Sequence, residues 1–78
     1  MTDLKETLVG IAKSIVDNPD AVVVTEEEDY DLITLTLSVD PEDMGMVIGR
    51  HGRIAKAIRT LIKAAAAGSG KRVNVDIR

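Results

Sequence analysis

Two glycines three residues apart, Gly49 and Gly52, constrain the fold of this chain more than any other feature of its sequence. Glycine adopts backbone conformations that other residues resist, so two glycines this close indicate a tight turn or a close approach of the backbone to another molecule. The pattern becomes helical immediately after Gly52, which places the loop at the N-terminus of a helix. Free backbone N–H groups and the helix dipole make such a position favourable for a phosphate.

The helix that follows the loop is predicted to begin near Arg53, to end at about Ala67 and to be amphipathic. At about 100° per residue, one face is apolar and is expected to pack on the core; its residues are Ile54, Ala57, Ile58, Leu61 and Ala65. The opposite face is basic and consists of Arg53, Lys56, Arg59 and Lys63. A short helix is predicted before the loop, with Asp40 as its N-cap and Pro41 in its first position.

The other segments complete an α+β pattern. An apolar stripe at helical spacing predicts a helix over residues 3–17, with Thr2 as its N-cap. Alternating apolar residues predict strands over 21–25, 32–39 and 71–78, and the acidic segment 26–31 is interpreted as the turn of an antiparallel hairpin. We therefore expect a single domain spanning residues 1–78, in which three helices cover one face of a three-stranded sheet.

Charge is distributed unevenly along the chain. The net charge is −3, but residues 1–43 carry twelve acidic and two basic side chains, whereas residues 44–78 carry one acidic and eight basic ones. The basic half contains the glycine loop, so we interpret the asymmetry as one surface suited to nucleic acid on an otherwise acidic protein. Segregation of charge for solubility alone is the alternative. Tyr30 is the only aromatic residue, which removes the stacking platforms that many single-strand binders use.

The sequence gives little support for catalysis. It has no cysteine, and His51 is the only histidine, so neither a thiolate metal site nor a credible active site is available. The acidic segment 26–31 matches no calcium-loop spacing and is better interpreted as a solvated turn. We expect no enzymatic activity, no metal and no cofactor. No apolar run is long enough to span a bilayer, so we expect a soluble, cytoplasmic protein without a membrane partner.

The segment from Val47 to Ile54, VIGRHGRI, resembles the signature of the KH RNA-binding domain. KH domains clamp four nucleotides of RNA backbone with a GXXG loop. The predicted order, helix–strand–strand–helix–helix–strand, is similar to that of the type II KH fold. A free-standing KH domain of this length, with Asp43-Met44-Gly45 before the loop, resembles the KhpA family of small bacterial single-domain KH proteins.

The resemblance implies a single-stranded RNA-binding protein of the bacterial cytoplasm, acting as an RNA chaperone or post-transcriptional regulator linked to cell division, cell shape and cell-wall growth. By motif position, the glycines admit the sugar-phosphate backbone, and the full set of implied RNA-binding residues is Gly49, Arg50, His51, Gly52, Arg53 and Lys56. The candidate apolar floor for the bases consists of Val47, Ile48 and Ile54, each of which could equally belong to the core. His51 could equally be a polar loop residue without a contact role.

The resemblance also implies partners beyond single-stranded RNA. Relatives in this family often work beside a larger KH-containing protein, KhpB (also called Jag), so a complex of that kind is one expected partner. A homodimer is the other, because dimerisation would raise the weak affinity of one small domain. A protein–protein interaction module, in which RNA binding is weak or incidental, is the competing interpretation, because the basic helix and the acidic hairpin could each serve as a docking surface.

Overall fold

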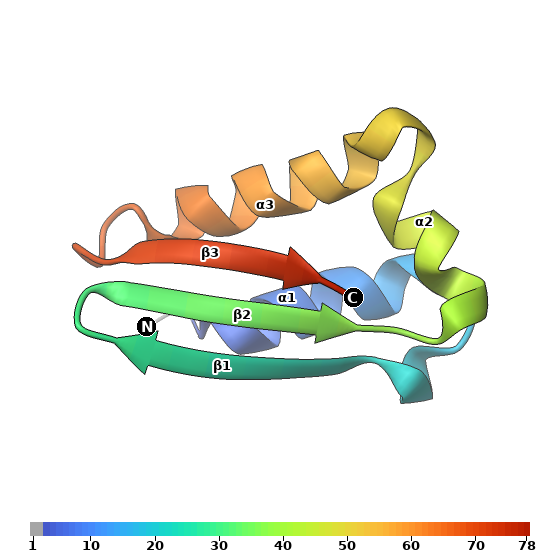
Figure 1. Ribbon diagram of the computed structural model, residues 1–78, viewed down its shortest axis with the longest axis horizontal. Coiled ribbons are helices and arrows are strands. Elements are labelled where there is room, and N and C mark those ends of the chain that lie inside the picture. The colour runs from blue at the N-terminus through green and yellow to red at the C-terminus, as the bar shows by residue number, and fades with distance from the viewer. Residues whose placement is uncertain (1–2) are drawn as a thin grey trace.

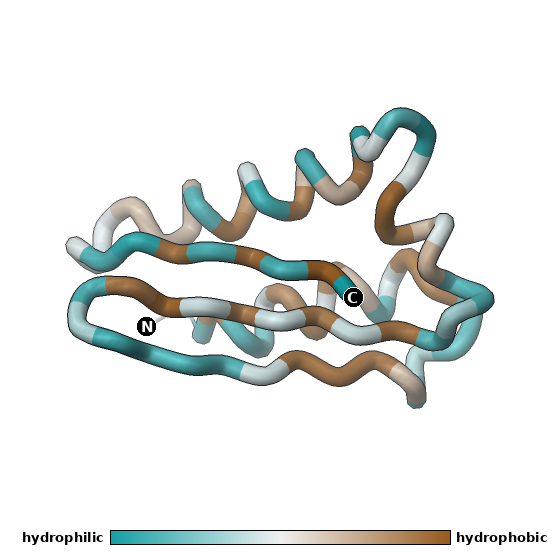
Figure 2. The backbone as a smooth tube through the Cα atoms, viewed as in Figure 1, coloured by the Kyte–Doolittle hydropathy of each residue, from teal (hydrophilic) through white to brown (hydrophobic). Residues whose placement is uncertain are grey.

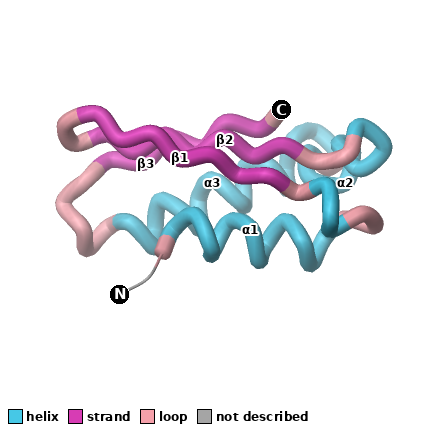
Figure 3. The backbone as a smooth tube through the Cα atoms, turned by 90° about the horizontal axis from the view of Figure 1, so that it is seen from below, coloured by secondary structure: helices cyan, strands magenta, loops and turns pink. Residues whose placement is uncertain are grey.

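The computed structural model describes residues 3–78, which form a three-stranded mixed sheet with the helices on one of its faces (Figures 1 and 3). The helices and strands, in chain order, are α1 (Leu4–Ile15), β1 (Val23–Asp29), β2 (Leu32–Ser38), α2 (Met44–Ile48), α3 (Arg53–Ala66) and β3 (Arg72–Ile77). Single 3-10 turns cover Pro19–Ala21, Pro41–Asp43 and Arg50–Gly52. This order confirms the predicted α+β fold of the type II KH kind. No helix in the described range is both long and apolar enough to cross a membrane.

The sheet has β2 at its centre, with β1 and β3 as its two edges. β1 pairs with β2 in antiparallel fashion, and β3 pairs with β2 in parallel, with Leu35 opposite Val75. The parallel ladder is fixed at both ends, where Arg72 N donates to Asp31 O at 2.7 Å and Arg78 N donates to Leu37 O at 2.8 Å. Because α2, the glycine loop and α3 form the crossover between these parallel strands, the sheet fixes the position of the loop.

Alternation along β2 builds the centre of the core. Ile33, Leu35, Leu37 and Val39 are all buried, as predicted, and the tube in Figure 2 alternates in hydropathy along this strand. Leu8 of α1 and Ile62 of α3 are fully buried in the same cluster. The core is therefore aliphatic, and the two long helices form a second layer against the sheet (Figure 3).

The predicted antiparallel hairpin is confirmed, but the predicted bounds of its first strand and of its acidic turn were wrong. β1 spans Val23–Asp29, so most of the acidic segment lies in the strand, and the turn is reduced to Tyr30 and Asp31. Tyr30 has a φ of 52°, the left-handed conformation that a two-residue hairpin turn requires. Backbone pairing with β2 overrides the low strand propensity of Glu and Asp. Figure 2 shows the second half of β1 as hydrophilic, and charged side chains on an edge strand discourage pairing with other chains.

The predicted inward face of α3 was also largely wrong. The buried residues are Ala55, Ile58, Ile62 and Ala66, and only Ile58 belongs to the predicted set. Ile58, Ile62 and Ala66 of this stripe belong to the aliphatic core cluster. Apolar residues occupy both this stripe and the predicted one, so periodicity alone does not decide which of the two faces the core. The helix is rotated about its axis relative to the predicted orientation, so Ile54 is 37% exposed and Leu61 is 56% exposed.

The N-terminus of α1 is capped by Asp3. The Asp3 Oδ1 atom accepts hydrogen bonds from Lys5 N at 3.0 Å and Glu6 N at 3.3 Å. The predicted cap, Thr2, lies outside the described residues. A carboxylate at this position satisfies free amides and also complements the helix dipole.

Candidate nucleic-acid interface

The glycine loop joins α2 to α3 through a backbone that most residues cannot adopt. Gly49, His51 and Gly52 all have positive φ values, of 75°, 58° and 72°. Gly49 combines its positive φ with a ψ of 174°, a region essentially restricted to glycine. His51 occupies the left-handed region, where histidine is enriched among the residues other than glycine. The local backbone therefore requires glycine at position 49 and favours it at position 52.

Gly52 presents its backbone to open space. An added Cβ at this residue would have no heavy atom within 4 Å. Gly52 is also the N-cap residue of α3, and no side chain in the described structure caps this helix. The amides of Gly52 and Arg53 donate within the loop itself, to Gly49 O and Arg50 O. An anion at this loop would therefore meet the open backbone at Gly52 and the positive end of the α3 dipole. The phosphate site stays a prediction.

The cationic side chains beside the loop have no acidic partner within the described part of the chain. Arg50, His51, Arg53 and Lys56 are all exposed, and none of them takes part in an ion pair there. Further along α3, Arg59 Nε donates a hydrogen bond to Val75 O at 3.2 Å. Arg59 therefore links the basic flank of α3 to the outer edge of β3, an anchoring role that its sequence position does not indicate.

The candidate apolar residues separate into two groups. Val47 is fully buried in the core, whereas Ile48 is 40% exposed and Ile54 37% exposed on either side of the loop. Met46, which the sequence interpretation did not include, is 37% exposed in α2. The structure thus offers Ile48 and Ile54 as apolar surface beside the loop, and it assigns Val47 to packing.

A buried carboxylate supports the start of α2. Asp43 is 2% exposed, and its Oδ2 atom accepts hydrogen bonds from Asn18 N at 3.0 Å and Asn18 Nδ2 at 3.2 Å. These bonds connect the segment after α1 to the residue that precedes α2. The sequence interpretation treated Asp43 only as an acid near a helix start, and nothing in the local pattern marks it as buried.

Comparisons with known proteins agree with this arrangement. Residues 5–77 match the family model described as "KhpA/KhpB, KH domain". A protein of Clostridium acetobutylicum named RNA-binding protein KhpA is 60% identical over 74 residues, which cover 95% of this chain and 99% of that protein. The protein of the same name from Caldanaerobacter subterraneus is 58% identical over 72 residues, covering 92% and 96% of the two chains. The one from Aquifex aeolicus is 46% identical over 77 residues, covering 99% and 98%.

Solved structures share the fold at low sequence identity. A crystal structure of Era in complex with MgGDPNP and a segment of 16S ribosomal RNA superposes with a TM-score of 0.66 at 16% identity, covering 95% of this chain and 28% of the Era chain. An Aquifex aeolicus Era variant bound to GDP and AlF4⁻ gives a TM-score of 0.65 at 15% identity, over 95% and 29% of the two chains. This chain thus corresponds to less than a third of Era, and the likeness is one of fold.

Proposed function

The chain belongs to the KhpA/KhpB KH-domain family, and on that premise we propose that it binds single-stranded RNA through the Gly49–Gly52 loop and the first turns of α3. The observation that carries this proposal is the coincidence of an open backbone at Gly52 with neighbouring cations that have no acidic partner among the described residues. The relatives at 46–60% identity that are named RNA-binding proteins support it independently.

In the proposed complex, one phosphate of the RNA lies over Gly52, at the positive end of the α3 dipole. Arg50 and His51 flank that phosphate, while Arg53 and Lys56 neutralise the next ones along the helix. Ile48 and Ile54 supply aliphatic surface for bases, which must replace the aromatic stacking that this chain lacks. The GXXG loop of KH domains clamps four nucleotides of backbone, which is the length of RNA that we propose for this set of residues.

The experiment that tests this proposal compares Gly52→Asp with Gly52→Asn. Asp and Asn have nearly the same shape, and both tolerate a positive φ better than other residues do. An added Cβ at Gly52 meets no other atom, so both variants are expected to fold. Only Asp places a negative charge against the phosphate. We expect Gly52→Asp to lower the affinity for a single-stranded RNA at least tenfold relative to Gly52→Asn, as measured by fluorescence anisotropy. Equal affinities of two folded variants would refute the loop assignment.

For the cellular role, we propose post-transcriptional regulation or RNA chaperoning in the bacterial cytoplasm, connected with cell division and cell-wall growth. We also propose a KH-containing partner of the KhpB kind, in keeping with the shared name of the family model. Deletion of the gene followed by measurement of cell dimensions tests the first proposal. Co-purification of a KH-containing protein from the native organism tests the second.

A second candidate function is protein binding through the outer flank of α3. The observed orientation of this helix leaves a row of apolar residues exposed. The row consists of Ile54, Ala57, Leu61 and Ala65, and we call it the α3 apolar row. Leu61 is the most exposed of its large residues, and its burial by a second copy or a related domain would remove apolar surface from water. A homodimer formed through this row would also place two RNA sites in one particle, which raises avidity.

A further inference from the structure

The β1–β2 hairpin lies at the opposite end of the molecule from the Gly49–Gly52 loop, next to the turn between α3 and β3 (Figure 1). The hairpin is strongly acidic; its acids are Glu26, Glu27, Glu28, Asp29 and Asp31, and all of them are exposed. The turn beside it carries two cations, Lys71 and Arg72. Two of the acids, Glu28 and Asp31, are paired with these cations.

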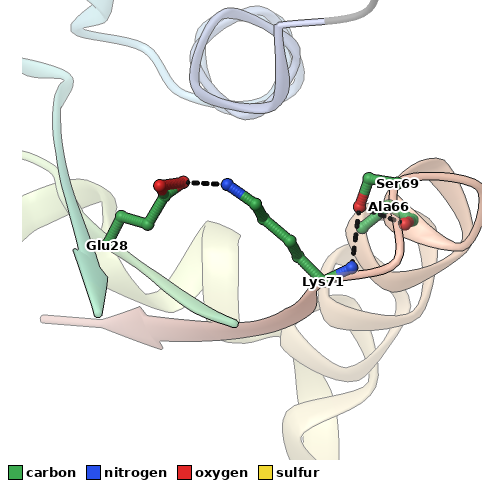
Figure 4. A network of polar contacts seen from close by, with 4 residues as sticks. All are labelled: Glu28, Ala66, Ser69 and Lys71. Carbon is green, nitrogen blue, oxygen red and sulfur yellow. Dashed lines mark hydrogen bonds and ion pairs between the residues drawn. The ribbon is translucent and has the colours of Figure 1, made fainter. Parts of the chain in front are cut away.

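Lys71 is held on both sides. Its Nζ lies 2.7 Å from Glu28 Oε1, and its backbone N donates to Ser69 Oγ at 3.2 Å. Ser69 Oγ in turn donates to Ala66 O at 2.7 Å, which ties the turn to the end of α3 (Figure 4). The Lys71 ammonium therefore points toward the hairpin and is occupied by a carboxylate.

Arg72 is held in the same way from the other side. Its backbone N donates to Asp31 O at 2.7 Å, and its guanidinium Nη2 lies 3.5 Å from Asp31 Oδ1. The parallel ladder between β2 and β3 begins at this backbone bond, so the strand register itself keeps the two side chains adjacent. Both side chains remain largely exposed, which leaves the ion pair in contact with water.

These two paired cations directly continue the basic flank of α3. A surface hollow of about 310 Å³ is lined by Lys63, Ala66, Lys71, Arg72 and Val73. Lys63 is therefore the last cation of α3 and shares one hollow with Lys71 and Arg72. Lys63 has no ion pair within the described residues, whereas the two cations beyond it each have one. Lys71 and Arg72 thus extend the basic flank of α3 past Lys63. Lys63 is, however, the last cation of this flank that has no acidic partner among the described residues.

We propose that the β1–β2 hairpin is an electrostatic boundary of the RNA site, in which Glu28 and Asp31 withhold Lys71 and Arg72 from phosphates and so end the site at Lys63. This inference rests on the proposed RNA binding and specifies the length of RNA that the surface accepts. A phosphate that reached the hollow would have to displace a carboxylate from each cation. The carbonyl end of α3 also disfavours an anion there.

The test removes the two carboxylates and varies the length of the RNA. The variant is Glu28→Gln with Asp31→Asn, and the control is Glu6→Gln with Asp20→Asn, which lowers the negative charge by the same two units elsewhere; all four side chains are exposed. Each protein is titrated with labelled four- and ten-nucleotide oligouridylates at several salt concentrations. A four-nucleotide RNA matches the segment that a GXXG loop clamps and does not reach the hairpin.

We expect the hairpin variant to bind the ten-nucleotide RNA at least threefold more tightly than the control variant, with no such difference for the four-nucleotide RNA. If both freed cations contact phosphates, the log–log salt slope for the longer RNA steepens by about 1.4, because each single-strand contact contributes about 0.7. Adding Lys71→Gln and Arg72→Gln to the hairpin variant is expected to abolish the gain and the extra slope.

Four outcomes would overturn the boundary. The first two are an equal gain in affinity for both RNA lengths and the same gain in affinity in the control variant. Either of them would mean that the acids act only through net charge. A gain that persists without Lys71 and Arg72 would mean that those cations are not what the acids withhold. No gain at either length would mean that the hairpin does not limit the site. If wild-type protein binds neither RNA, the proposed function itself fails, which is a separate result.

Discussion

Gly49 and Ile54 are packed so closely that a Cβ added at Gly49 would lie 2.6 Å from Ile54 Cγ1 and 2.9 Å from both Ile54 Cβ and Cδ1. Real Cβ atoms do not approach other carbons to this extent, so the first glycine of the loop is required by packing as well as by its φ. Gly52 has the same sign of φ but no such neighbour. The two glycines of the motif thus have different reasons to be glycine: Gly49 holds the loop against α3, and Gly52 keeps the backbone open.

The first prediction follows from this difference and compares Gly49→Ala with Gly52→Ala. Alanine at Gly49 combines a glycine-only backbone conformation with overpacking against Ile54, and we expect a loss of about 3 kcal/mol or more in the free energy of unfolding. Alanine at Gly52 has only the strain of a left-handed backbone conformation, and we expect the free energy of unfolding to fall by about 1–2 kcal/mol. Urea unfolding followed by far-UV circular dichroism measures both. Equal losses would contradict the packing argument. A variant with an acidic residue at both glycines is consequently a poor test of RNA binding.

The second prediction concerns salt. If Arg50, Arg53 and Lys56 each neutralise one phosphate, the log–log dependence of RNA affinity on salt has a slope of about −2, because single-strand contacts contribute about −0.7 each. Lys56→Gln is expected to make the slope shallower by about 0.7. Lys5→Gln removes the same charge from the first turn of α1, which lies toward the end of the molecule away from the loop (Figure 1), and is expected to leave the slope unchanged. A slope near zero for the wild-type protein would argue against phosphate contacts at this surface.

Much of the fold follows from local patterns in the sequence, because those patterns carry their own physical cause. The alternation of Ile33, Leu35, Leu37 and Val39 predicts the central strand, and Asp40 with Pro41 predicts the helix start that the structure shows, where Glu42 N donates to Asp40 Oδ1 at 2.9 Å. The glycine spacing predicts the loop between helices and its place before α3. Each of these features depends on residues close together in the chain.

The features that the sequence did not reveal depend on tertiary contacts. The length of β1 depends on the pairing partner that β2 offers to Glu26, Glu27 and Glu28, whose own propensity favours a turn. The inward face of α3 depends on its packing against the other elements, because apolar residues occupy two neighbouring stripes of the helix and only the stripe with Ile62 and Ala66 joins the core cluster. The burial of Asp43 depends on Asn18, 25 residues away in the chain. Local periodicity contains none of this information.

The third prediction addresses that buried carboxylate. Asp43→Ala leaves the backbone N–H of Asn18 without its acceptor, and we expect the free energy of unfolding to fall by about 2–3 kcal/mol. Asn18→Ala removes only the side-chain bond to Asp43, and we expect a loss of about 1 kcal/mol. The same urea unfolding experiment measures both losses. A change below about 0.5 kcal/mol for Asp43→Ala would mean that these bonds do not stabilise the fold.

The fourth prediction checks the orientation of α3. Ile62 is fully buried, and we expect Ile62→Ala to lower the free energy of unfolding by about 2–5 kcal/mol. Leu61, its neighbour in the sequence, is more than half exposed, and we expect Leu61→Ala to change the free energy of unfolding by about 0.5 kcal/mol or less at monomeric concentrations. The face predicted from hydrophobic periodicity reverses this ranking, so the two variants decide between the two orientations of the helix.

The last prediction asks whether the α3 apolar row is a protein-binding surface. Burying Leu61 and Ile54 against a second copy would remove from water the apolar surface that the observed orientation of α3 leaves exposed. We expect the wild-type protein to sediment as a dimer at high micromolar concentration. Leu61→Glu is expected to yield a monomer, because two carboxylates would face each other across a twofold interface. Thr60→Glu adds the same charge on the outer side of the helix and is expected to leave the dimer intact.

If wild-type and Leu61→Glu proteins have the same mass at every concentration, the α3 apolar row does not mediate self-association. If Leu61→Glu becomes monomeric and keeps its affinity for a four-nucleotide RNA, the part of the α3 apolar row around Leu61 acts independently of the RNA-binding surface, and Ile54 is the residue that the two surfaces share.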